Sequence, residues 1–312
     1  MKKIKAGLIG LGTIGLKRNS KNKKIINDTH FYNLINNKNF DLLAVSDLKI
    51  NLIKNINNTN NLKYYNNYKK MLSKHFFDMI VIATPVKSHF EIIKDLQKYK
   101  IKLIFCEKPF LSNKKELSYL SLDKYKTKYQ INYSRRFISN FIKLKKLFSK
   151  QLINELIYVN INYSRGLRNN GSHFVDLILW YFGKPNSVKY STKTKSKSFQ
   201  DDFSVNIVLN YKNNFNIYLN SIDIKYVRME EMDFIFSNKR IRIINDKIYY
   251  YKLSEEPLNA MLNKFSLFKV EKIDYSNSLK LAYKNIVNLF KKKAKINSGL
   301  TESKQIMDIL NL

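Results

Sequence analysis

Cysteine, proline, glycine and tryptophan are scarce in this chain of 312 residues, which contains one, four, eight and one of them, respectively. The single cysteine, Cys106, excludes an intramolecular disulfide framework and is typical of a protein in a reducing compartment. It follows the apolar residues LIF (103–105), so we expect its thiol to be a small buried group of the core. The expected location of the protein is therefore the cytoplasm.

Long apolar runs are also missing from the sequence. No stretch approaches the roughly 20 apolar residues that a membrane span requires. Residues 1–18 imitate a signal peptide, with lysines followed by a short apolar segment, but no small-residue cleavage site follows and the next residues are strongly basic. We therefore expect no membrane partner.

Acidic residues are few, 24 against 57 Lys and Arg, and the formal net charge is +33. Such a charge could indicate a protein that binds nucleic acid. Only eight of the basic residues are Arg, however, and the lysines are spread along the whole chain, whereas nucleic-acid-binding proteins concentrate Lys and Arg on one face and favour Arg. Lys, Asn, Ile and Tyr have A/T-rich codons, so codon bias explains much of the charge. Nucleic acid is an unlikely partner, although the charge would attract anionic metabolites.

The few glycines are not scattered, because four of the eight fall within the first fifteen residues. Three of them form GLGTIG (10–15), directly after the apolar run 6–9. A lone G-x-G-x-x-G is weak evidence, but here a strand is predicted before it and a helix after it. Gly10 would allow the tight turn, Gly12 the approach of a pyrophosphate and Gly15 the packing of helix on strand. The predicted cofactor-binding residues of this loop are Gly10, Gly12, Thr13, Ile14 and Gly15.

An acidic residue, Asp47, ends a second predicted strand, LLAVSD (42–47). It would accept hydrogen bonds from the adenosine ribose and repel the 2′-phosphate of NADP, so NAD is the expected cofactor; NADP is not excluded, because Lys49 would soften this preference. Asp47 lies 32 residues after Gly15, whereas the usual spacing is about 20. The polar segment around 19–24 and the stretch 29–35 would absorb the excess as a longer crossover.

Strands and helices alternate through the first part of the chain. The predicted strands are 79–83, 102–106 and 128–132, and the predicted helices are 88–99 and 113–122, the latter capped by Asn113 or Ser112. This alternation predicts a doubly wound parallel sheet, a Rossmann domain over residues 1–133.

The pattern changes after about residue 134. The next predicted elements are a helix at 137–149, a strand at 156–163, a helix around His173, strands at 187–195, 203–210, 215–223, 231–237 and 240–251, and helices at 276–292 and 301–311. Long strands in succession, joined by short polar turns, indicate a mostly antiparallel sheet. The fold class is therefore α/β, with a Rossmann domain followed by a second α/β domain over 134–312 that has a large open sheet.

One of the four histidines lies in the stretch RNNGSHFVDLILWYFG (168–183). On a helix His173, Asp176, Leu177 and the only tryptophan, Trp180, share one face. Such a face is often no more than an apolar stripe of the core, and Trp180 is expected to be core. The role of His173 depends on the rest of the chain.

Together these motifs resemble the glucose–fructose oxidoreductase / inositol dehydrogenase (Gfo/Idh/MocA) family of NAD(P)-dependent oxidoreductases. The most specific element is the tripeptide E-K-P between a strand and a helix. The matching segments are GLGTIG (10–15), VSD (45–47), ATPVKSHFE (83–91), CEKP (106–109), NYSRRF (132–137) and GSHFVDLILWYFG (171–183).

The resemblance implies a second domain that binds a sugar or polyol and forms a homo-oligomer through its sheet. The lysine of E-K-P, which in the family contacts the reacting hydroxyl, matches Lys108, and the family's acid/base histidine matches His173. Glu107 and the Thr84–Pro85 turn match residues that line the nicotinamide half of the cofactor. His89 is expected to pack or cap its helix near the cofactor.

These residue types suit the oxidation of an alcohol by hydride transfer. A histidine with an ordinary pKa near 6.5 can exchange the hydroxyl proton at cellular pH. A lysine ammonium can polarise the substrate oxygen and stabilise developing alkoxide charge. No metal site is expected, and two histidines outside the motifs, His30 and His75, are assigned no role.

The sequence departs from the family at one position. Many members have an aspartate four residues before the histidine, but this chain has Asn169, which can hold a hydroxyl or carbonyl group but cannot take a proton. His173 and Lys108 would then carry the proton chemistry, with Asp176 orienting the His173 helix or contacting substrate. The alternative is a non-catalytic dinucleotide-binding sensor with the same fold.

Four of the eight arginines lie between residues 135 and 168. In a chain that ordinarily uses lysine for charge, they suggest planar, bidentate recognition of an anion. Arg135 and Arg136 would face the substrate or brace the domain junction, and Arg165 and Arg168 would grip a carboxylate or the diphosphate of a nucleotide-linked sugar. The predicted substrate is an anionic sugar, such as a nucleotide sugar of surface-glycan biosynthesis.

Overall fold

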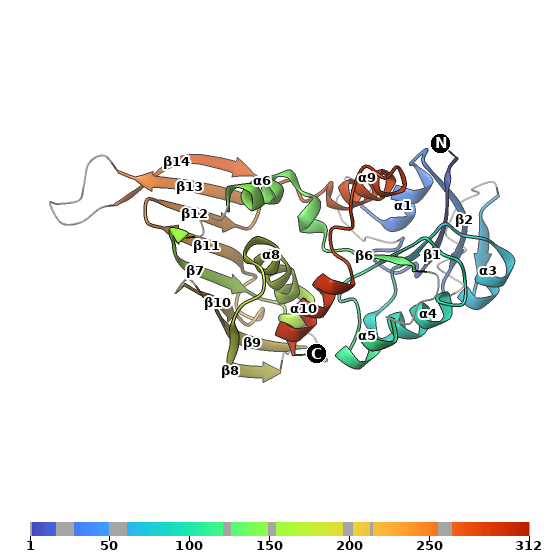
Figure 1. The fold of residues 1–312 in the computed structure, drawn as a ribbon, viewed down its shortest axis with the longest axis horizontal. Helices are drawn as coiled ribbons and strands as arrows, with labels where there is room; N and C mark the ends of the chain where they lie inside the picture. The colour runs from blue at the N-terminus through green and yellow to red at the C-terminus, as the bar shows by residue number, and fades with distance from the viewer. Residues whose placement is uncertain are drawn as a thin grey trace. The chain divides into compact units, whose positions relative to one another are not determined.

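The computed structural model describes residues 2–16, 28–49, 61–120, 126–148, 154–195, 202–212, 215–254 and 264–311 (Figure 1). The chain forms two compact units, of which the first comprises Met1–Phe137, Ser276–Asp308 and Leu312 and the second Ile138–Tyr275 and Ile309–Asn311. The sequence predicted a domain boundary at residue 133. Residues 276–308, expected in the second domain, belong instead to the first unit.

The first unit is built on a six-stranded parallel sheet with the order β3-β2-β1-β4-β5-β6. Its strands are β1 (Ile4–Ile9), β2 (Phe40–Ser46), β3 (Lys63–Tyr65), β4 (Met79–Ile82), β5 (Leu103–Cys106) and β6 (Lys128–Ile131). The apolar residues of β4 and β5 are buried on both faces, as in sheets covered by helices on each side. The predicted Rossmann sheet is confirmed, and its order reverses between β1 and β4, where such sheets bind their ligands.

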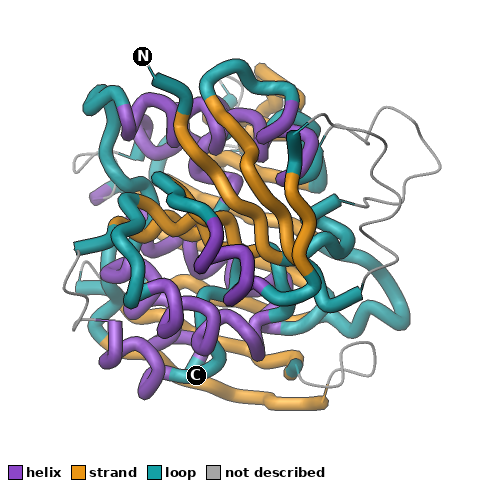
Figure 2. Tube along the Cα trace, turned by 90° about the vertical axis from the view of Figure 1, so that its right-hand side faces the viewer, coloured by secondary structure: helices purple, strands orange, loops and turns teal. Residues whose placement is uncertain are grey.

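Helices lie on both faces of this sheet (Figures 1 and 2). The helical segments of the first unit are α1 (His30–Ile35), α3 (Tyr68–Lys74), η2 (Val86–Ser88), α4 (His89–Leu96), α5 (Lys114–Leu120), η3 (Ser134–Phe137), α9 (Ser278–Phe290) and all but the end of α10 (Leu300–Leu310). Helix α9 buries Leu279, Ala282, Tyr283 and Ile286, spaced as one helical face, in the same core cluster as the strands β1, β4 and β5. This packing explains why the carboxyl-terminal helices belong to the first unit, since a sequence pattern shows an apolar face but not the element that covers it.

The first helix of the sheet is assembled from two segments of the chain. Leu16 N donates to Gly12 O, as in the first turn of a helix, but His30 N then donates to Ile14 O (3.0 Å) and Phe31 N to Gly15 O (2.9 Å). In a continuous α-helix the donor lies four positions after the acceptor, whereas here it lies sixteen positions after it, so twelve residues are inserted. Without these twelve, the 32 residues between Gly15 and Asp47 become the usual spacing of about 20. The stretch 29–35, which was expected to absorb the excess, instead contains helix α1, and the segment around 19–24 lies outside the described residues.

The second unit contains an eight-stranded sheet with the order β14-β13-β12-β11-β7-β10-β9-β8, in which only β7 and β10 are parallel neighbours. Its strands are β7 (Leu156–Tyr163), β8 (Ser187–Lys195), β9 (Phe203–Asn210), β10 (Asn216–Ser221), β11 (Glu230–Phe236), β12 (Lys239–Ile244), β13 (Lys247–Leu253) and β14 (Phe265–Lys272). The predicted large, mostly antiparallel sheet is confirmed.

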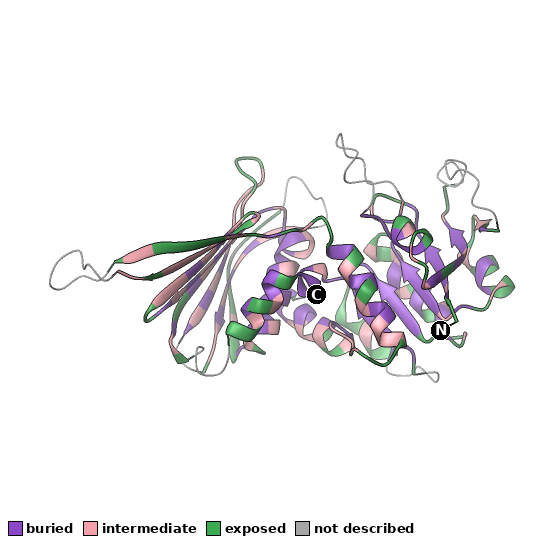
Figure 3. Cartoon of the chain, turned by 90° about the horizontal axis from the view of Figure 1, so that it is seen from above, coloured by how far each residue is buried: buried purple, intermediate pink, exposed green. Residues whose placement is uncertain are grey.

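One face of this sheet packs against helices α6 (Ser139–Leu147) and α8 (Ser172–Phe182), while buried and half-buried residues alternate along the strands (Figure 3). Aromatic rings form much of the contact: Phe234 of β11 lies 5.0 Å from Phe148 and 6.4 Å from Tyr181, measured between ring centroids. This packing fixes α8, which carries His173.

The observed elements differ from the sequence predictions in two ways. The strand expected at 240–251 is two strands, because Asn245, with φ of 52°, and Asp246 form a two-residue hairpin turn between β12 and β13. Strands β3 and β14 and helix α3 were not predicted. Cys106 is buried as expected, and burial raises the pKa of its thiol.

Candidate active site

The glycine loop follows β1, and two of its glycines are required by the fold itself. Gly10 has φ of 97°, and a Cβ there would lie 2.7 Å from the backbone of Ala83. A Cβ on Gly15 would lie 2.1 Å from Gly10 O. Gly12 is different, because no atom of the described residues would lie within 4 Å of its Cβ. Its exposed backbone therefore offers the close approach that a pyrophosphate needs, and the loop fits a dinucleotide.

Asp47 stands directly after β2, beside the glycine loop. Its Oδ2 accepts a hydrogen bond from Leu11 N (2.7 Å) and its Oδ1 accepts one from Lys49 N (2.8 Å). The two backbone groups fix the carboxylate at the carboxyl edge of the sheet. This is the position from which an acidic residue contacts the adenosine ribose in Rossmann domains.

The Thr84–Pro85 turn follows β4, and a hydrogen bond to His89 stabilises it. The His89 ring is 1% exposed, with Nε2 2.8 Å from Thr84 O and Nδ1 2.9 Å from Phe110 O. Ser88 Oγ also donates to Thr84 Oγ1 (2.8 Å). His89 therefore joins the loops after β4 and β5, which agrees with the expected packing role.

Glu107, the first residue of E-K-P, lies in a buried hydrogen-bond network that the sequence did not predict. His30 Nε2 lies 2.9 Å from Glu107 Oε1, which also accepts from Asn132 Nδ2 (2.6 Å). On its other side, His30 Nδ1 lies 2.9 Å from the Tyr283 hydroxyl. His30 and Tyr283 are fully buried, so the network ties α1 and α9 to the loop after β5. The sequence interpretation that left His30 without a role is wrong.

The protonation states in this network follow from its surroundings. Burial alone would raise the pKa of Glu107, but the hydrogen bond and charge of His30, together with Asn132 and Lys108, outweigh it and hold that pKa below its usual value. Burial raises the pKa of the Tyr283 phenol, with the charge of Glu107 adding to the effect. An ionised Glu107 carboxylate can only accept, so His30 donates to it through Nε2–H, while His30 Nδ1 bonds the Tyr283 hydroxyl.

Lys108 is held in place by this network through its backbone. Its amide N donates to Glu107 Oε2 at 3.3 Å, and its peptide bond to Pro109 is cis. Phe110 and Leu111, the next two residues, are buried. The loop is thus anchored on both sides of a half-buried lysine, at the same carboxyl edge of the sheet as the glycine loop, Asp47 and Thr84.

In the second unit, His173 lies in the first turn of α8. His173, Trp180 and Phe182 are half-buried, and the other eight residues of the helix are buried. Trp180, expected in the core, stacks on Tyr181 with ring centroids 5.6 Å apart. Asp176 is 1% exposed. Among the titratable side chains of α8, His173 is therefore the one that is partly accessible.

The segment before α8 is a π-helical turn, η4 (Leu167–Gly171), and a single carboxylate holds it. Asp202 accepts hydrogen bonds from the backbone N of Arg168 and of Asn169, both at 2.9 Å, and from Phe203 N at 2.8 Å. The chain enters this turn through Arg165 and Gly166, whose φ angles are 73° and 80°. A Cβ at Gly166 would lie 2.2 Å from Asp202 Oδ2. π-Turns occur often at functional sites.

The arginines that the sequence analysis assigned to the substrate fall into two groups. Arg136 is 3% exposed, and its guanidinium donates to Asn297 O at 2.6 Å, within the first unit. Of the two roles that the sequence left open for it, contact with a substrate or bracing, this hydrogen bond favours bracing, within the first unit. Arg165 and Arg168 are half-buried; Arg168 and Asn169 lie on the η4 turn, shortly before His173, and Arg165 lies two residues before the turn begins.

The fold and the glycine loop define the class of protein, a dinucleotide-binding Rossmann protein. Residues 4–131 match the oxidoreductase family with an NAD-binding Rossmann fold, GFO_IDH_MocA. Residues 4–131 thus carry the NAD-binding domain of this oxidoreductase family, which confirms the resemblance seen in the motifs, and the chain is an NAD-dependent oxidoreductase. A comparison with curated proteins gave no match.

Solved structures with the same fold include several dehydrogenases. The WlbA dehydrogenase from Bordetella pertussis, in complex with NADH and UDP-GlcNAcA, has a TM-score of 0.79 at 17% identity, covering 99% of this chain and 94% of that one. The WlbA dehydrogenase from Chromobacterium violaceum, with the same two ligands, has a TM-score of 0.77 at 16% identity, covering 100% and 92%. An oxidoreductase from Agrobacterium radiobacter in complex with NAD+, L-tartaric acid and magnesium has a TM-score of 0.75 at 12% identity, covering 99% and 95%. These likenesses establish the fold of the whole chain. Within its described part, no helix combines the length and apolarity needed to cross a membrane.

Proposed function

We propose that this oxidoreductase transfers a hydride between NAD and a hydroxyl-bearing carbon of an anionic sugar. The observation that carries the proposal is the E-K-P loop, where a buried, ionised Glu107 fixes the backbone of Lys108 at the carboxyl edge that also carries the glycine loop. A lysine fixed in this way is pre-organised to polarise an oxygen. Bound NAD would accept the hydride.

In the proposed reaction, the ammonium of Lys108 stabilises charge that develops on the substrate oxygen, and His173 removes or returns the hydroxyl proton. His173 lies in the first turn of α8, and its imidazole, when neutral, can accept a proton. Asp202 does not replace the family aspartate missing at position 169, because its two oxygens already accept three backbone N–H groups. The proton chemistry is therefore assigned to His173 and Lys108.

An anionic substrate is supported by Arg165 and Arg168, which the η4 turn places just before His173. Their planar guanidinium groups match a carboxylate or a phosphate in a way that lysine does not. Two neighbours with this fold bind anions, UDP-GlcNAcA in one case and L-tartaric acid in the other. A nucleotide sugar is the substrate class that we propose, with Asn169 and Asp176 as further contacts.

Two substitutions test the assignment of the chemistry. Lys108→Ala and His173→Ala should each lower kcat with UDP-GlcNAcA by about 100-fold or more, since each removes an interaction made in the transition state. NADH affinity, measured by fluorescence titration, should change by less than about threefold, because neither side chain is assigned to the adenosine half. Tartrate and a neutral free sugar serve as comparison substrates.

Single-turnover absorbance of bound NADH separates an enzyme from a sensor. Turnover in the wild type that disappears in both variants supports the proposal. Near-normal turnover in His173→Ala would show that the general base lies elsewhere. NAD+ binding without any reduction to NADH, in the presence of all three substrates, would favour the alternative of a non-catalytic dinucleotide sensor, which the Asn169 replacement suggests.

A further inference from the structure

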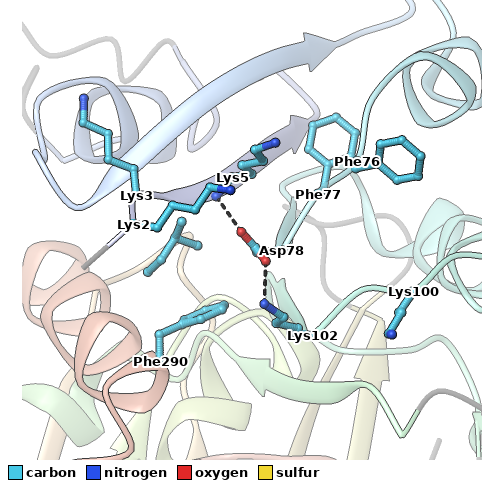
Figure 4. A pocket seen from close by; sticks show the side chains of 10 residues that line it. Lys2, Lys3, Lys5, Phe76, Phe77, Asp78, Lys100, Lys102 and Phe290 are labelled. Carbon is cyan, nitrogen blue, oxygen red and sulfur yellow. Dashed lines mark hydrogen bonds and ion pairs between the residues drawn. The ribbon is translucent and has the colours of Figure 1, made fainter.

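The amino-terminal edge of the first unit's sheet, opposite the cofactor loops, carries a basic hollow (Figure 4). The hollow has a volume of about 550 Å³ and is lined by five lysines, three phenylalanines and one acidic residue, Asp78. A second hollow of about 310 Å³ shares Lys102 and Phe290 with the first and adds Lys126, Lys128 and Lys292. The first volume lies within the range of small-molecule sites.

The backbone arranges charged residues in a row along this edge. Asp78 N donates to Lys5 O (2.8 Å), Lys102 N to Asp78 O (3.0 Å) and Lys128 N to Lys102 O (3.1 Å). Lys5 and Lys128 lie on β1 and β6, Asp78 and Lys102 directly precede β4 and β5, and neighbouring strands are spaced by about 4.8 Å. Three of the four positions in the row carry lysine, so positive charge repeats along the edge.

The charge here exceeds what the composition of the chain explains. At the overall ratio of 24 acidic to 57 basic residues, eight lysines would be accompanied by about three acidic residues. Asp78 is the one acidic residue among the described residues that line the two hollows. Its carboxylate is already paired, since it accepts from Lys5 N (3.0 Å) and from Lys102 Nζ (2.8 Å). The other seven lysines have no acidic counterpart within these linings.

An aromatic ring stands beside these cations. Phe76 is 92% exposed, more than any other large apolar side chain among the described residues, while its neighbour Phe77 is buried. Figure 4 shows Phe76 and Phe77 on one side of the hollow and Phe290 on another. Exposed rings next to lysines are the combination on which nucleobases stack while their phosphates are neutralised.

We propose that this edge is a second binding site, for a nucleoside polyphosphate. The lysine row holds the phosphates as point charges, and Phe76 stacks on the base. The strands place this site roughly 15 Å from the carboxyl edge, at about 3.3 Å per residue. The ligand can therefore bind while NAD occupies the glycine loop. The site is independent of the proposed dehydrogenase reaction.

Isothermal titration of the full chain with ATP tests the proposal, at about 150 mM salt to suppress unspecific charge effects. Saturating NADH blocks the dinucleotide site throughout. ATP should bind, tripolyphosphate should bind more weakly, and adenosine should bind weakly or not at all. In Phe76→Ala the affinity for ATP should fall about fivefold while that for tripolyphosphate stays unchanged, because only the ring contact is lost.

A matched pair of triple variants separates the site from general charge. Lys3→Gln/Lys100→Gln/Lys128→Gln removes three exposed cations of the edge and should weaken ATP about tenfold or more. Lys184→Gln/Lys189→Gln/Lys212→Gln removes three exposed cations of the second unit and should have almost no effect. Neither set touches the proposed catalytic residues, so kcat should persist in both. Three results would each overturn the proposal. The first is an equal loss of ATP affinity in the two triple variants, and the second is loss of ATP binding in the presence of NADH. The third is a single-stranded oligonucleotide that binds more tightly than ATP and depends equally on the lysines.

Discussion

At the scale of single residues, the active-site loop depends on a histidine that lies 77 positions before the carboxylate it contacts. His30 joins the phenol of Tyr283 to Glu107, and Glu107 in turn holds the amide of Lys108. A fully buried imidazole with partners on both nitrogens cannot move without leaving one of them unsatisfied. We therefore regard His30 as a positioning residue for Lys108.

Replacing His30 should alter catalysis in a pH-dependent way. In His30→Phe, Glu107 loses the partner that lowers its pKa, so that pKa should rise and activity should fall toward acidic pH where the wild type stays active. We expect kcat to fall about tenfold to 100-fold near neutral pH, with KM for NADH nearly constant. His30→Gln, whose amide can donate to Glu107 and accept from Tyr283, should recover much of the activity.

The control for this variant is His75→Phe. It removes an imidazole that bonds the Tyr65 hydroxyl at 2.8 Å. It should leave the pH–rate profile unchanged. If the pH–rate profile of His30→Phe were also unchanged, His30 would be a packing residue and not a positioning residue.

His30 also shows what a sequence pattern cannot convey. The three glycines, Asp47 and Lys108 were found because their motifs are contiguous and their strands have clear apolar runs. His30 was missed because an insertion of twelve residues separates it from the glycine loop that it continues. Asp202 was missed because it lies 29 residues after His173 and belongs to no motif, so only the folded backbone brings it to the η4 turn.

At the scale of elements, the η4 turn carries the residues assigned to the substrate. Its conformation depends on Asp202 and on two consecutive residues with positive φ, Arg165 and Gly166. The backbone that leads into the turn is strained, and one carboxylate fixes it. The arginines are therefore held in a defined direction, which bidentate recognition requires.

Removing the carboxylate should weaken substrate binding more than cofactor binding. In Asp202→Ala three backbone N–H groups lose their acceptor, so KM for an anionic substrate should rise about tenfold, with NADH affinity nearly constant. Arg168→Lys, which keeps the charge but loses the planar fork, should also raise this KM. Asp223→Ala, which removes a carboxylate that caps another turn of the second unit, is the control. Unchanged kinetics in both Asp202→Ala and Arg168→Lys would remove η4 from the substrate site.

A second carboxylate joins helices α3 and α4. Asp95 accepts from the Tyr68 hydroxyl (2.8 Å) and lies 3.1 Å from Lys69 Nζ and 2.7 Å from Lys98 Nζ. Burial would raise its pKa, but the hydrogen bonds of Lys98, Tyr68 and Lys69 lower it to about 2. The depressed pKa means that this contribution to stability is complete above the unfolded value of about 3.9 and is lost as the pH falls toward 2.

Urea denaturation across this pH range tests the linkage. Asp95→Asn should lower the free energy of unfolding by about 1 kcal/mol at pH 7, since the exposed lysines are screened by solvent. The difference from the wild type should shrink below about pH 4. Asp41→Asn, at an exposed position of β2, should show no such trend. A difference that stays constant down to pH 3 would show that ionisation of Asp95 is not its source.

The elements themselves were predicted to different degrees. The buried strands of the parallel sheet and the alternating strands of the second unit follow from their periodicity, and the hydrogen bonds of Glu116 with Asn113 confirm the expected cap of α5. Strand β3 has only three residues, too few for a period to be visible. The β12–β13 turn was hidden because Asn245 and Asp246 interrupt an otherwise continuous run of strand-forming residues.

At the scale of the whole molecule, the second sheet offers an ordered surface for association. On its helix-free side Tyr158 stacks on Tyr218 with ring centroids 5.4 Å apart, Asn220 donates to Asn160 Oδ1 at 2.6 Å, and Asp233 pairs with Arg240. Tyr158 is exposed, the other side chains are half-buried, and all of them contact one another in these pairs within one chain. Such pre-ordering lowers the entropy cost of forming an interface.

We therefore expect a homo-oligomer built on this face, with light scattering giving a multiple of 37.0 kDa. Tyr158→Glu would place a charge in the centre of the contact and should shift the protein to the monomer. Tyr226→Glu, at an exposed turn outside the sheet, should not. A monomeric wild type at micromolar concentration would contradict the expectation.

The return of residues 276–308 to the first unit has a consequence for the growing chain. The ribosome supplies Leu279, Ala282 and Tyr283 only after the whole eight-stranded sheet has been synthesised. Until then one face of the nucleotide-binding sheet lacks part of its cover and His30 lacks its phenol partner. A nascent chain must therefore keep apolar surface exposed through the synthesis of the second unit, the period in which chaperones bind. The domain that is made first is the last to be completed.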